Sequence, residues 1–276
     1  MKKIAILGCG YIGRALTVKW KKKNYSLTAT VQKPKNQEPL LKLVQKVHLI
    51  KSFDEESLQS IVQQNEVIVL TLSADSPNEY EDTFSKAAQA LYKLAQKNRT
   101  PKFLIYTSRT SIYGEQNGMW VDEGADLKPI SEADRILIET EKILLSLQEF
   151  NWKVCILRLA EVYGPDCEVS KKTHRLSKEI IDCYQNVYTN MIHLDDIVGI
   201  IDFVLTHQLS GVFNLSDDQH PTLKEFLKEI YHALNIPPKT TWEAKTTKPY
   251  LGNFRVSNYK IKRIGYQLSH PDRVIN

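Results

Sequence analysis

The chain has 276 residues, of which 42% are hydrophobic and 25% are charged, and its formal net charge at pH 7 is +5. This composition is typical of a globular protein and excludes disordered and collagen-like chains. The densest run of positive charge, Lys19-Trp20-Lys21-Lys22-Lys23, is predicted to be a solvated helix end. No nucleic-acid partner is expected, because neither an arginine-rich arm nor an aromatic RNA-binding signature accompanies this run.

Strands and helices alternate along the first part of the chain. The apolar run Ile4-Ala5-Ile6-Leu7, closed by Gly8, predicts a buried parallel strand, and a helix is predicted over residues 11–22. The elements predicted next are strands at 26–31 and 47–50, a helix from 54, a strand at 67–72, a helix over 78–98, and strands at 103–106 and 154–157. Because parallel strands need crossover helices, this alternation predicts an α/β fold, a Rossmann-like doubly wound parallel sheet with helices on both faces.

The rhythm changes after residue 165. Helices are predicted over 173–186, 195–206 and 222–235, with short strands at 187–189 and 211–215. We therefore predict a dinucleotide-binding Rossmann domain over residues 1–160 and a smaller, partly interleaved C-terminal substrate-binding region over residues 161–276.

The spacing of the cysteines and the length of the apolar runs indicate the cellular compartment in which the protein is expected. The four cysteines show no C-x-x-C spacing, which favours a reducing environment. The first apolar stretch ends at Gly8 and soon meets Arg14, so it is too short for a signal peptide, and no apolar run reaches the roughly 18 residues of a membrane span. A cytoplasmic protein without a membrane partner is expected.

The segment Gly8-Cys9-Gly10-Tyr11-Ile12-Gly13 matches G-x-G-x-x-G between a predicted strand and a predicted helix. Gly8 permits the tight turn, Gly10 leaves space for a pyrophosphate, and Gly13 lets the helix approach the strand. The helix then begins at Tyr11 and Ile12 and offers its free N–H groups to the phosphates. A strand-to-helix turn without a ligand is the alternative, but the flanking elements favour nucleotide binding.

The cofactor type is predicted from the end of the second strand, where NAD-selective sites usually carry an acid. Here Gln32 and Lys33 take that place and Lys35 follows, so cations are available for a 2′-phosphate. This favours NADP, with NAD as the alternative, unless Gln32 and Lys33 are solvated loop residues. Leu72 and Ser73, at the end of the 67–72 strand, are assigned to the same cofactor site.

Several further segments carry a resemblance to a known family. They are, in order, Tyr106-Thr107-Ser108-Arg109-Thr110-Ser111-Ile112-Tyr113-Gly114, Val121-Asp122-Glu123, Leu157-Arg158-Leu159-Ala160-Glu161-Val162-Tyr163-Gly164-Pro165, Ile192-His193-Leu194-Asp195-Asp196 and Gly211-Val212-Phe213-Asn214-Leu215. Together with the glycine segment, they make the chain resemble the extended and atypical short-chain dehydrogenases/reductases, the NAD-dependent epimerase/dehydratase group. The resemblance implies a Rossmann-like sheet with a small substrate-binding region, and it places Ala160 and Glu161 where the family's chain passes the nicotinamide.

The resemblance fails at the catalytic pair. The family uses a Tyr and, four residues later, a Lys, but no tyrosine of this chain has a lysine at the fourth following position. With Glu141 as the family's downstream anchor, the two positions fall on Ala133 and Leu137. Neither side chain can transfer a proton.

Four residues remain as candidates for catalysis or substrate binding. Counting back from Tyr113-Gly114, the family's Ser/Thr position falls on Arg109, with Ser108 and Thr110 beside it. A guanidinium cannot act as a base at neutral pH, but it suits a carboxylate or phosphate, so Arg109 is either an anion holder or part of a surface ion pair. Asp134 fits a capping box with Ser131, and a substitute general acid is its alternative role.

No metal is predicted, because His193 and its neighbours Asp195 and Asp196 lack a metal-ligand spacing; packing or helix capping is expected there. The leading hypothesis is a divergent NAD(P)-binding oxidoreductase or epimerase/dehydratase-type enzyme acting on a small substrate. Anionic compounds and sugar nucleotides are the expected substrate classes. A non-catalytic dinucleotide-binding redox sensor or scaffold is the rival. The oligomeric state stays open.

Overall fold

A computed structural model describes residues 1–74, 76–169, 180–181, 186–235, 241–242 and 252–275. The chain forms two units and passes between them several times. Unit 1 consists of Met1–Ser108, Ser131–Leu157 and Ile200–Val212. Unit 2 consists of Arg109–Ile130, Arg158–Gly199 and Phe213–Asn276.

A seven-stranded sheet has the strand order β11-β7-β5-β4-β1-β2-β3. Its strands are β1 (Lys2–Leu7), β2 (Tyr25–Val31), β3 (Lys46–Leu49), β4 (Val67–Leu70), β5 (Lys102–Arg109), β7 (Trp152–Leu159) and β11 (Gly211–Leu215). The pairings of β1 with β2 and β4, of β2 with β3 and of β4 with β5 are parallel. The order reverses at β1, which pairs with β2 on one side and β4 on the other, and this is the switch point of a doubly wound sheet.

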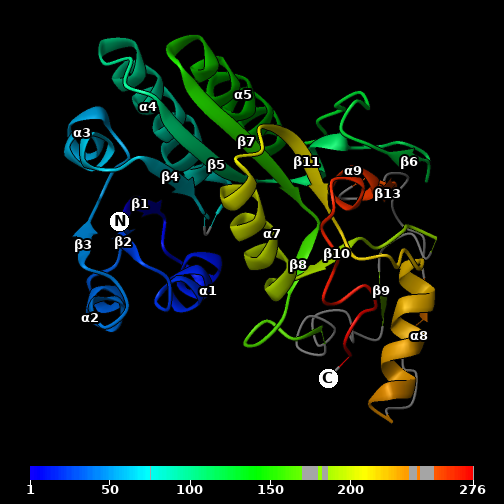
Figure 1. The fold of residues 1–276 in the computed structure, drawn as a ribbon. Helices are drawn as coiled ribbons and strands as arrows, with labels where there is room; N and C mark the ends of the chain where they lie inside the picture. Colours follow the sequence, from blue (N-terminus) through cyan, green and yellow to red (C-terminus); the bar gives the residue numbers. More distant parts are fainter. Residues whose placement is uncertain (75, 170–179, 182–185, 236–240, 243–251, 276) are drawn as a thin grey trace. The chain divides into compact units, whose positions relative to one another are not determined.

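Helices cover both faces of this sheet. The helices that lie in unit 1 or end in it are α1 (Tyr11–Trp20), α2 (Gln37–Leu41), α3 (Glu55–Gln64), α4 (Lys86–Lys97), α5 (Glu132–Ser146) and α7 (Leu194–His207). Figure 1 shows α3, α4 and α5 side by side on one face and α1 and α2 on the other. The Trp20 indole N–H donates to Asp202 Oδ1 across 2.8 Å, which joins the end of α1 to α7. The predicted fold class is confirmed.

The core of unit 1 follows from its apolar strands. Residues Val67–Leu70 are buried throughout, as are the last four residues of β1, so both faces of these central strands are covered. Trp20 has no exposed surface, although lysines surround it in the sequence. In the predicted run of positive charge, the lysines contact solvent and the tryptophan does not. One of these lysines, Lys23, also forms an ion pair with Asp202 at 2.6 Å.

Unit 2 contains shorter elements. They are β6 (Trp120–Val121), β8 (Glu161–Tyr163), β9 (Ile180–Ile181), β10 (Met191–His193), β12 (Thr241–Trp242), β13 (Arg255–Val256), α8 (Leu223–Ala233) and α9 (Tyr259–Arg263). Among the residues of unit 2 that the structure describes, three two-stranded parallel pairs form, β10 with β8, β12 with β9 and β13 with β6.

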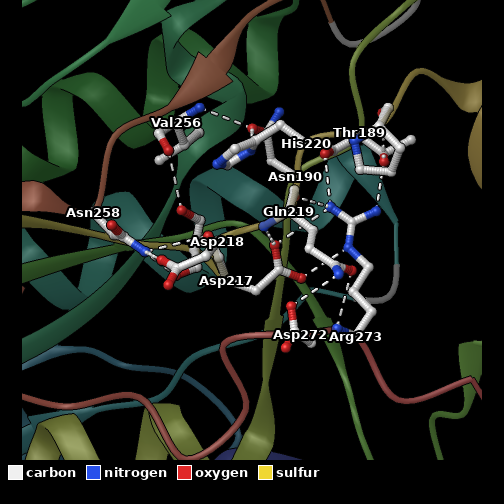
Figure 2. A network of polar contacts seen from close by, with 12 residues as sticks. Thr189, Asn190, Asp217, Asp218, Gln219, His220, Val256, Asn258, Asp272 and Arg273 are labelled. Atoms are coloured by element: carbon white, nitrogen blue, oxygen red, sulfur yellow. Dashed lines mark hydrogen bonds and ion pairs between the residues drawn. The ribbon is translucent and has the colours of Figure 1, made fainter.

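The C-terminal segment of unit 2 is fixed by Arg273. Figure 2 shows its guanidinium between Thr189, Asp217 and Gln219, and it donates to Asp217 Oδ2 at 2.8 Å, to Thr189 Oγ1 at 2.6 Å and to the Gln219 carbonyl at 2.5 Å. The guanidinium also lies 4.9 Å from the centre of the Phe226 ring on α8. One arginine therefore contacts residue 189, residues 217 and 219 and Phe226 of α8, all more than 40 residues before it in the sequence.

Most predicted elements are confirmed, with three corrections. Within the helix predicted over 173–186, residues 180–181 form strand β9 instead, paired with β12. Residues 173–179 and 182–185 of that prediction lie outside the described residues. The strand predicted at 187–189 is wrong, because Tyr188 forms only an isolated bridge with Thr222. The helix predicted over 78–98 begins with short 3₁₀ and π turns, and regular α-helix starts only at Lys86.

Candidate functional site

The turn after β1 is built as its glycines require. Gly8 has φ +78°, and a Cβ there would lie 2.9 Å from the Leu72 side chain. Two threonines fix this turn, since the Gly8 N–H donates to Thr30 Oγ1 and the Thr71 hydroxyl donates to the Gly8 carbonyl, each across 2.9 Å. The ends of β1, β2 and β4 are thereby joined at the switch point.

The other two glycines differ in what surrounds them. A Cβ on Gly13 would lie 3.0 Å from Thr71 Oγ1 and 3.2 Å from Cys9 Sγ, so this glycine lets α1 pack closely on the strands. A Cβ on Gly10 would approach no atom closer than 4.0 Å. Gly10 is also the N-cap of α1, and no side chain caps that helix start among the described residues. The Gly10 N–H donates to the Gly8 carbonyl at 2.7 Å. The open space at Gly10 therefore lies directly at a helix start that has no side-chain cap.

A pocket of about 160 Å³ opens at this turn in unit 1. Its lining residues are Gly8, Cys9, Gly10, Thr30, Val31, Gln32, Lys33, Asn36, Phe53, Leu72, Ser73, Glu79 and Thr83. Six residues predicted for the cofactor site are among them: Gly8, Gly10, Gln32, Lys33, Leu72 and Ser73. Tyr11, Ile12 and Gly13 form the adjoining first turn of α1.

Sequence reasoning missed one cation beside this pocket. Arg14 Nη2 donates to Asn36 Oδ1 across 3.0 Å, and Asn36 lines the pocket together with Lys33. Arg14 is only partly buried. The sequence shows only that Arg14 directly follows the last glycine of the segment. The structure shows that α1 brings its side chain to the segment that follows β2.

The Cys9 thiol inside the glycine segment is not a nucleophile at neutral pH. Cys9 is buried, and burial raises the pKa of its thiol to about 12, with Arg14 acting in the opposite direction. A thiol with this pKa stays protonated at neutral pH. Cys9 is thus a small apolar residue of the turn.

Ala160 and Glu161 belong to unit 2. The Ala160 N–H donates to the Leu215 carbonyl at 2.9 Å, and the Glu161 N–H donates to the Asn190 carbonyl at 3.0 Å. Glu161 begins strand β8 and its side chain is exposed. Their predicted contact with a cofactor stays a prediction.

The three candidates around Arg109 have different surroundings. Ser108 is 1% exposed, and within the described part of the chain its hydroxyl has no hydrogen-bond partner. Arg109 is the last residue of β5 itself, not part of a loop after it, and it is exposed. Thr110 is buried and begins a 3₁₀ turn, Thr110–Tyr113.

The capping box predicted at the start of α5 is confirmed. The Ser131 hydroxyl accepts the Asp134 N–H, and Asp134 Oδ2 accepts hydrogen bonds from the Ser131 N–H at 3.1 Å and hydroxyl at 2.6 Å. Asp134 is 5% exposed. These contacts account for the carboxylate and favour capping over the role of a general acid. Further along α5, Leu137 is buried in the apolar face of the helix.

Four of the sequence segments singled out above meet in one buried network of unit 2. Arg158 Nη1 donates to the Tyr113 hydroxyl at 2.9 Å, and this hydroxyl donates to Asn214 Oδ1 at 2.7 Å. Glu123 Oε1 accepts the Asn214 backbone N–H at 2.7 Å. Burial raises the pKa of Tyr113, with Arg158 opposing, so its hydroxyl stays protonated. The spacing of these segments reflects shared packing.

The sequence profile of the NAD dependent epimerase/dehydratase family matches residues 4–216, which is well over half of the chain. The chain belongs to this family. The six glycine-segment residues and the network of Tyr113, Arg158 and Asn214 all lie inside the matched range.

The chain is similar to several proteins whose sequences differ from it at most positions. Protein YeeZ of Escherichia coli K12 is 26% identical over 100% of this chain and 98% of its own length. A functionally unknown conserved protein from Silicibacter pomeroyi has a TM-score of 0.79 at 21% identity, covering 99% of this chain and 95% of that chain. A dTDP-glucose 4,6-dehydratase from Bacillus anthracis, solved in complex with NAD, has a TM-score of 0.81 at 17% identity, covering 98% and 92%. These structures show that the fold is shared.

No helix among the described residues of this family member is long and apolar enough to cross a membrane.

Proposed function

We propose that this chain binds a nicotinamide dinucleotide at the glycine turn and is an oxidoreductase or epimerase/dehydratase-type enzyme for a small anionic substrate. The observation that carries the proposal is Gly10. Its missing side chain leaves open space in the pocket, directly at the uncapped start of α1. A helix N-terminus with free N–H groups favours a pyrophosphate, and the bound cofactor would supply hydride transfer.

NADP is the proposed cofactor. Lys33 lines the pocket and Arg14 is held beside it by Asn36, so two cationic side chains lie near the proposed 2′-phosphate. The phosphate contact is expected to favour NADPH over NADH by about 1.5–3 kcal/mol, the scale of a hydrogen bond to a charged group. Glu79 also lines the pocket and would oppose this preference.

Calorimetric titration of NADPH and NADH tests the cofactor proposal. The preference for NADPH should shrink in Arg14→Ala and Lys33→Ala, whereas Lys19→Ala, which changes an exposed lysine on the same helix as Arg14, should leave it unchanged. Equal or stronger binding of NADH by the parent protein would remove NADP from the proposal. Binding of neither cofactor would remove the nucleotide site itself.

The substrate proposal rests on Arg109 and its neighbours. Arg109 lies at the carboxyl end of β5, the end of the strands at which doubly wound sheets bind ligands. Its guanidinium can hold a carboxylate or phosphate, and the buried hydroxyl of Ser108 has no partner in the described chain and can orient a substrate hydroxyl. Sugar nucleotides are one class that satisfies both requirements, and the dehydratase named above acts on one.

Arg109→Ala tests this anion holder. Binding of an anionic substrate should weaken by about 1.5–3 kcal/mol, while the affinity for the cofactor stays near that of the parent. A screen that finds only neutral ligands, or an Arg109→Ala variant that binds its anionic ligand as tightly as before, would return Arg109 to a surface ion pair.

A non-catalytic dinucleotide-binding sensor or scaffold is the second candidate. The absence of a tyrosine followed by a lysine four residues later and the buried Leu137 on α5 favour it. The two candidates separate in a cofactor-reduction assay with a panel of sugar nucleotides and hydroxy acids. Turnover that depends on the added substrate supports the enzyme, and cofactor binding without turnover across the panel supports the sensor.

A further inference from the structure

Two histidines and an aspartate converge in unit 2. His193 ends β10, Asp195 lies in the first turn of α7, and His270 comes from the segment after α9. Asp195 Oδ2 is 3.2 Å from His270 Nε2 and 3.5 Å from His193 Nδ1. One ligand atom from each residue lies within 4.8 Å of the others. Because His270 is distant in sequence, the local pattern around His193 could not indicate this cluster.

The two separations from Asp195 Oδ2 fit a common metal ion. Zinc bonds to histidine nitrogen and to carboxylate oxygen are about 2.0–2.1 Å long, so two ligand atoms in a tetrahedral site lie about 3.3 Å apart. The separations of 3.2 and 3.5 Å lie on either side of this value. Two imidazoles and one carboxylate form a common three-ligand set that leaves one position for solvent.

The lone pair of His193 is directed into the cluster. His193 Nδ1 lies 3.1 Å from the Asp195 backbone N–H, which donates to it, so this nitrogen is unprotonated and faces Asp195. The carboxylate oxygen of Asp195 is therefore a second acceptor on the same side of the ring. A cation bound by both acceptors would take the place of the 3.1 Å hydrogen bond from the Asp195 N–H.

Both rings are held in place. Their centroids are 3.7 Å apart with planes at 37°, and the Tyr163 ring meets His193 edge-on with centroids 5.0 Å apart. These ring contacts fix the planes of both imidazoles within the cluster.

The neighbouring Asp196 fixes the segment that carries His270. Asp196 has no exposed surface, and its carboxylate accepts the Ser269 N–H at 2.7 Å and the His270 N–H at 2.9 Å. Gly199 on α7 gives this segment room, because a Cβ there would lie 2.2 Å from the Tyr266 hydroxyl. Such supporting contacts orient the ligands of protein metal sites.

We propose that His193, Asp195 and His270 bind a divalent zinc-type ion, with solvent completing its coordination. The ion has access from solvent, since the side chains of Asp195 and His270 are 64% and 26% exposed. It ties the start of α7 to the C-terminal segment and so acts as a structural clasp. The alternative is the same three side chains without an ion, with His193 Nδ1 accepting the Asp195 N–H and His270 Nε2 in contact with Asp195 Oδ2.

Zinc titration of the full chain tests this proposal, with any affinity tag removed and the protein first treated with a chelator. Zn²⁺ is titrated against a competing fluorescent chelator in the absence of nucleotide, and Co²⁺ is added separately to record the visible absorption of a tetrahedral site. We expect one ion per chain and a higher melting temperature with Zn²⁺. Asp195→Asn and His270→Ala should each lower the affinity at least about tenfold, the smallest loss seen when even a supporting group of a metal site is removed.

His207→Ala is the matched control, because His207 is an exposed histidine at the far end of the same helix α7. Its affinity for Zn²⁺ should equal that of the parent. Should His270→Ala fail to fold, Asp195→Asn decides, since it is isosteric and Asp195 is exposed. The proposal is wrong if the parent binds Zn²⁺ no more tightly than Asp195→Asn, or if the Co²⁺ spectrum is that of the hydrated ion. Neither result depends on cofactor binding.

Discussion

The guanidinium of Arg273 and the carboxylate of Asp217 form a buried ion pair, with Nε 2.8 Å from Oδ2 and side chains that are 1% and 0% exposed (Figure 2). Burial raises the pKa of Asp217 to about 6, and Arg273 opposes this shift. Asp217 is therefore ionised above about pH 6, and Arg273 offsets part of the cost of desolvating its charge. The pair fixes Arg273 inside unit 2.

Arg273→Ala is expected to lower the free energy of unfolding at pH 8 by about 3–5 kcal/mol, because it leaves the Asp217 charge buried without its partner. The loss should be smaller at pH 5, where Asp217 takes up a proton and the buried charge disappears. Urea unfolding at both pH values measures this. Lys262→Ala, which breaks the half-exposed pair with Asp218, should cost no more than about 1 kcal/mol. A similar loss for both variants would show that burial does not matter here.

His220 belongs to the same network and titrates with the opposite sign. Burial, and then the charge of Arg273, lowers the pKa of His220 to about 4, while Asp218 acts in the other direction and Arg255 adds to the lowering. Its ring Nδ1 lies 3.0 Å from Asn190 Oδ1, which also accepts the Val256 N–H. Since this oxygen can only accept, the neutral ring must carry its proton on Nδ1.

We therefore expect His220 to make the protein less stable as the pH falls. The unfolded state binds a proton near pH 6.5 and the folded state only near pH 4, so this contribution is complete above pH 6.5 and is lost between these values. The difference in unfolding free energy between the parent and His220→Gln should change in this window, with the parent losing more. Asp217 titrates in both proteins and cancels in the difference. A constant difference from pH 7 to pH 4 would contradict the prediction.

Tyr113→Phe tests the buried network in unit 2. The substitution removes the acceptor of Arg158 and the donor to Asn214 without changing the ring, which packs against Phe254 with centroids 6.0 Å apart. We expect a loss of about 1–3 kcal/mol in unfolding free energy, the cost of leaving buried polar groups unpaired. Tyr259→Phe is the control, because Tyr259 is 65% exposed, and its effect should stay within about 0.5 kcal/mol. Equal effects would mean that the hydroxyl of Tyr113 is dispensable.

What could be predicted from the sequence depends on the range of the interactions. The glycine segment and the capping box of Ser131 and Asp134 act over a few residues, so their spacing predicts their geometry. The strand at 180–181 pairs with 241–242, and its local sequence predicted a helix instead. Tertiary pairing overrides local propensity in such segments.

The same reason separates the predicted and the unforeseen parts of the candidate sites. Gln32 and Lys33 follow directly from the end of a predicted strand. By contrast, Arg14 reaches Asn36 across 22 residues, and Asp195 meets His270 across 75. These contacts depend on how helices and loops pack, and no spacing within the sequence indicates them.

Two glycines of the glycine turn should respond differently to the same substitution. A valine should lower stability at one position and abolish cofactor binding at the other. At Gly13 a Cβ would lie 3.0 Å from Thr71 Oγ1 and 3.2 Å from the Ile6 side chain, so Gly13→Val should lower the unfolding free energy by about 1–3 kcal/mol through overpacking. At Gly10 a Cβ meets nothing closer than 4.0 Å, so Gly10→Val should fold like the parent. Its side chain would instead occupy the space that the proposed pyrophosphate needs, and NADPH binding should be lost.

Circular dichroism, urea unfolding and NADPH titration of both variants distinguish the two roles. Loss of binding together with parent-like stability in Gly10→Val supports a phosphate site at Gly10. A Gly10→Val protein that is well folded and binds NADPH normally would show that the bound dinucleotide lies elsewhere, because no close approach to the Gly10 backbone would then be needed.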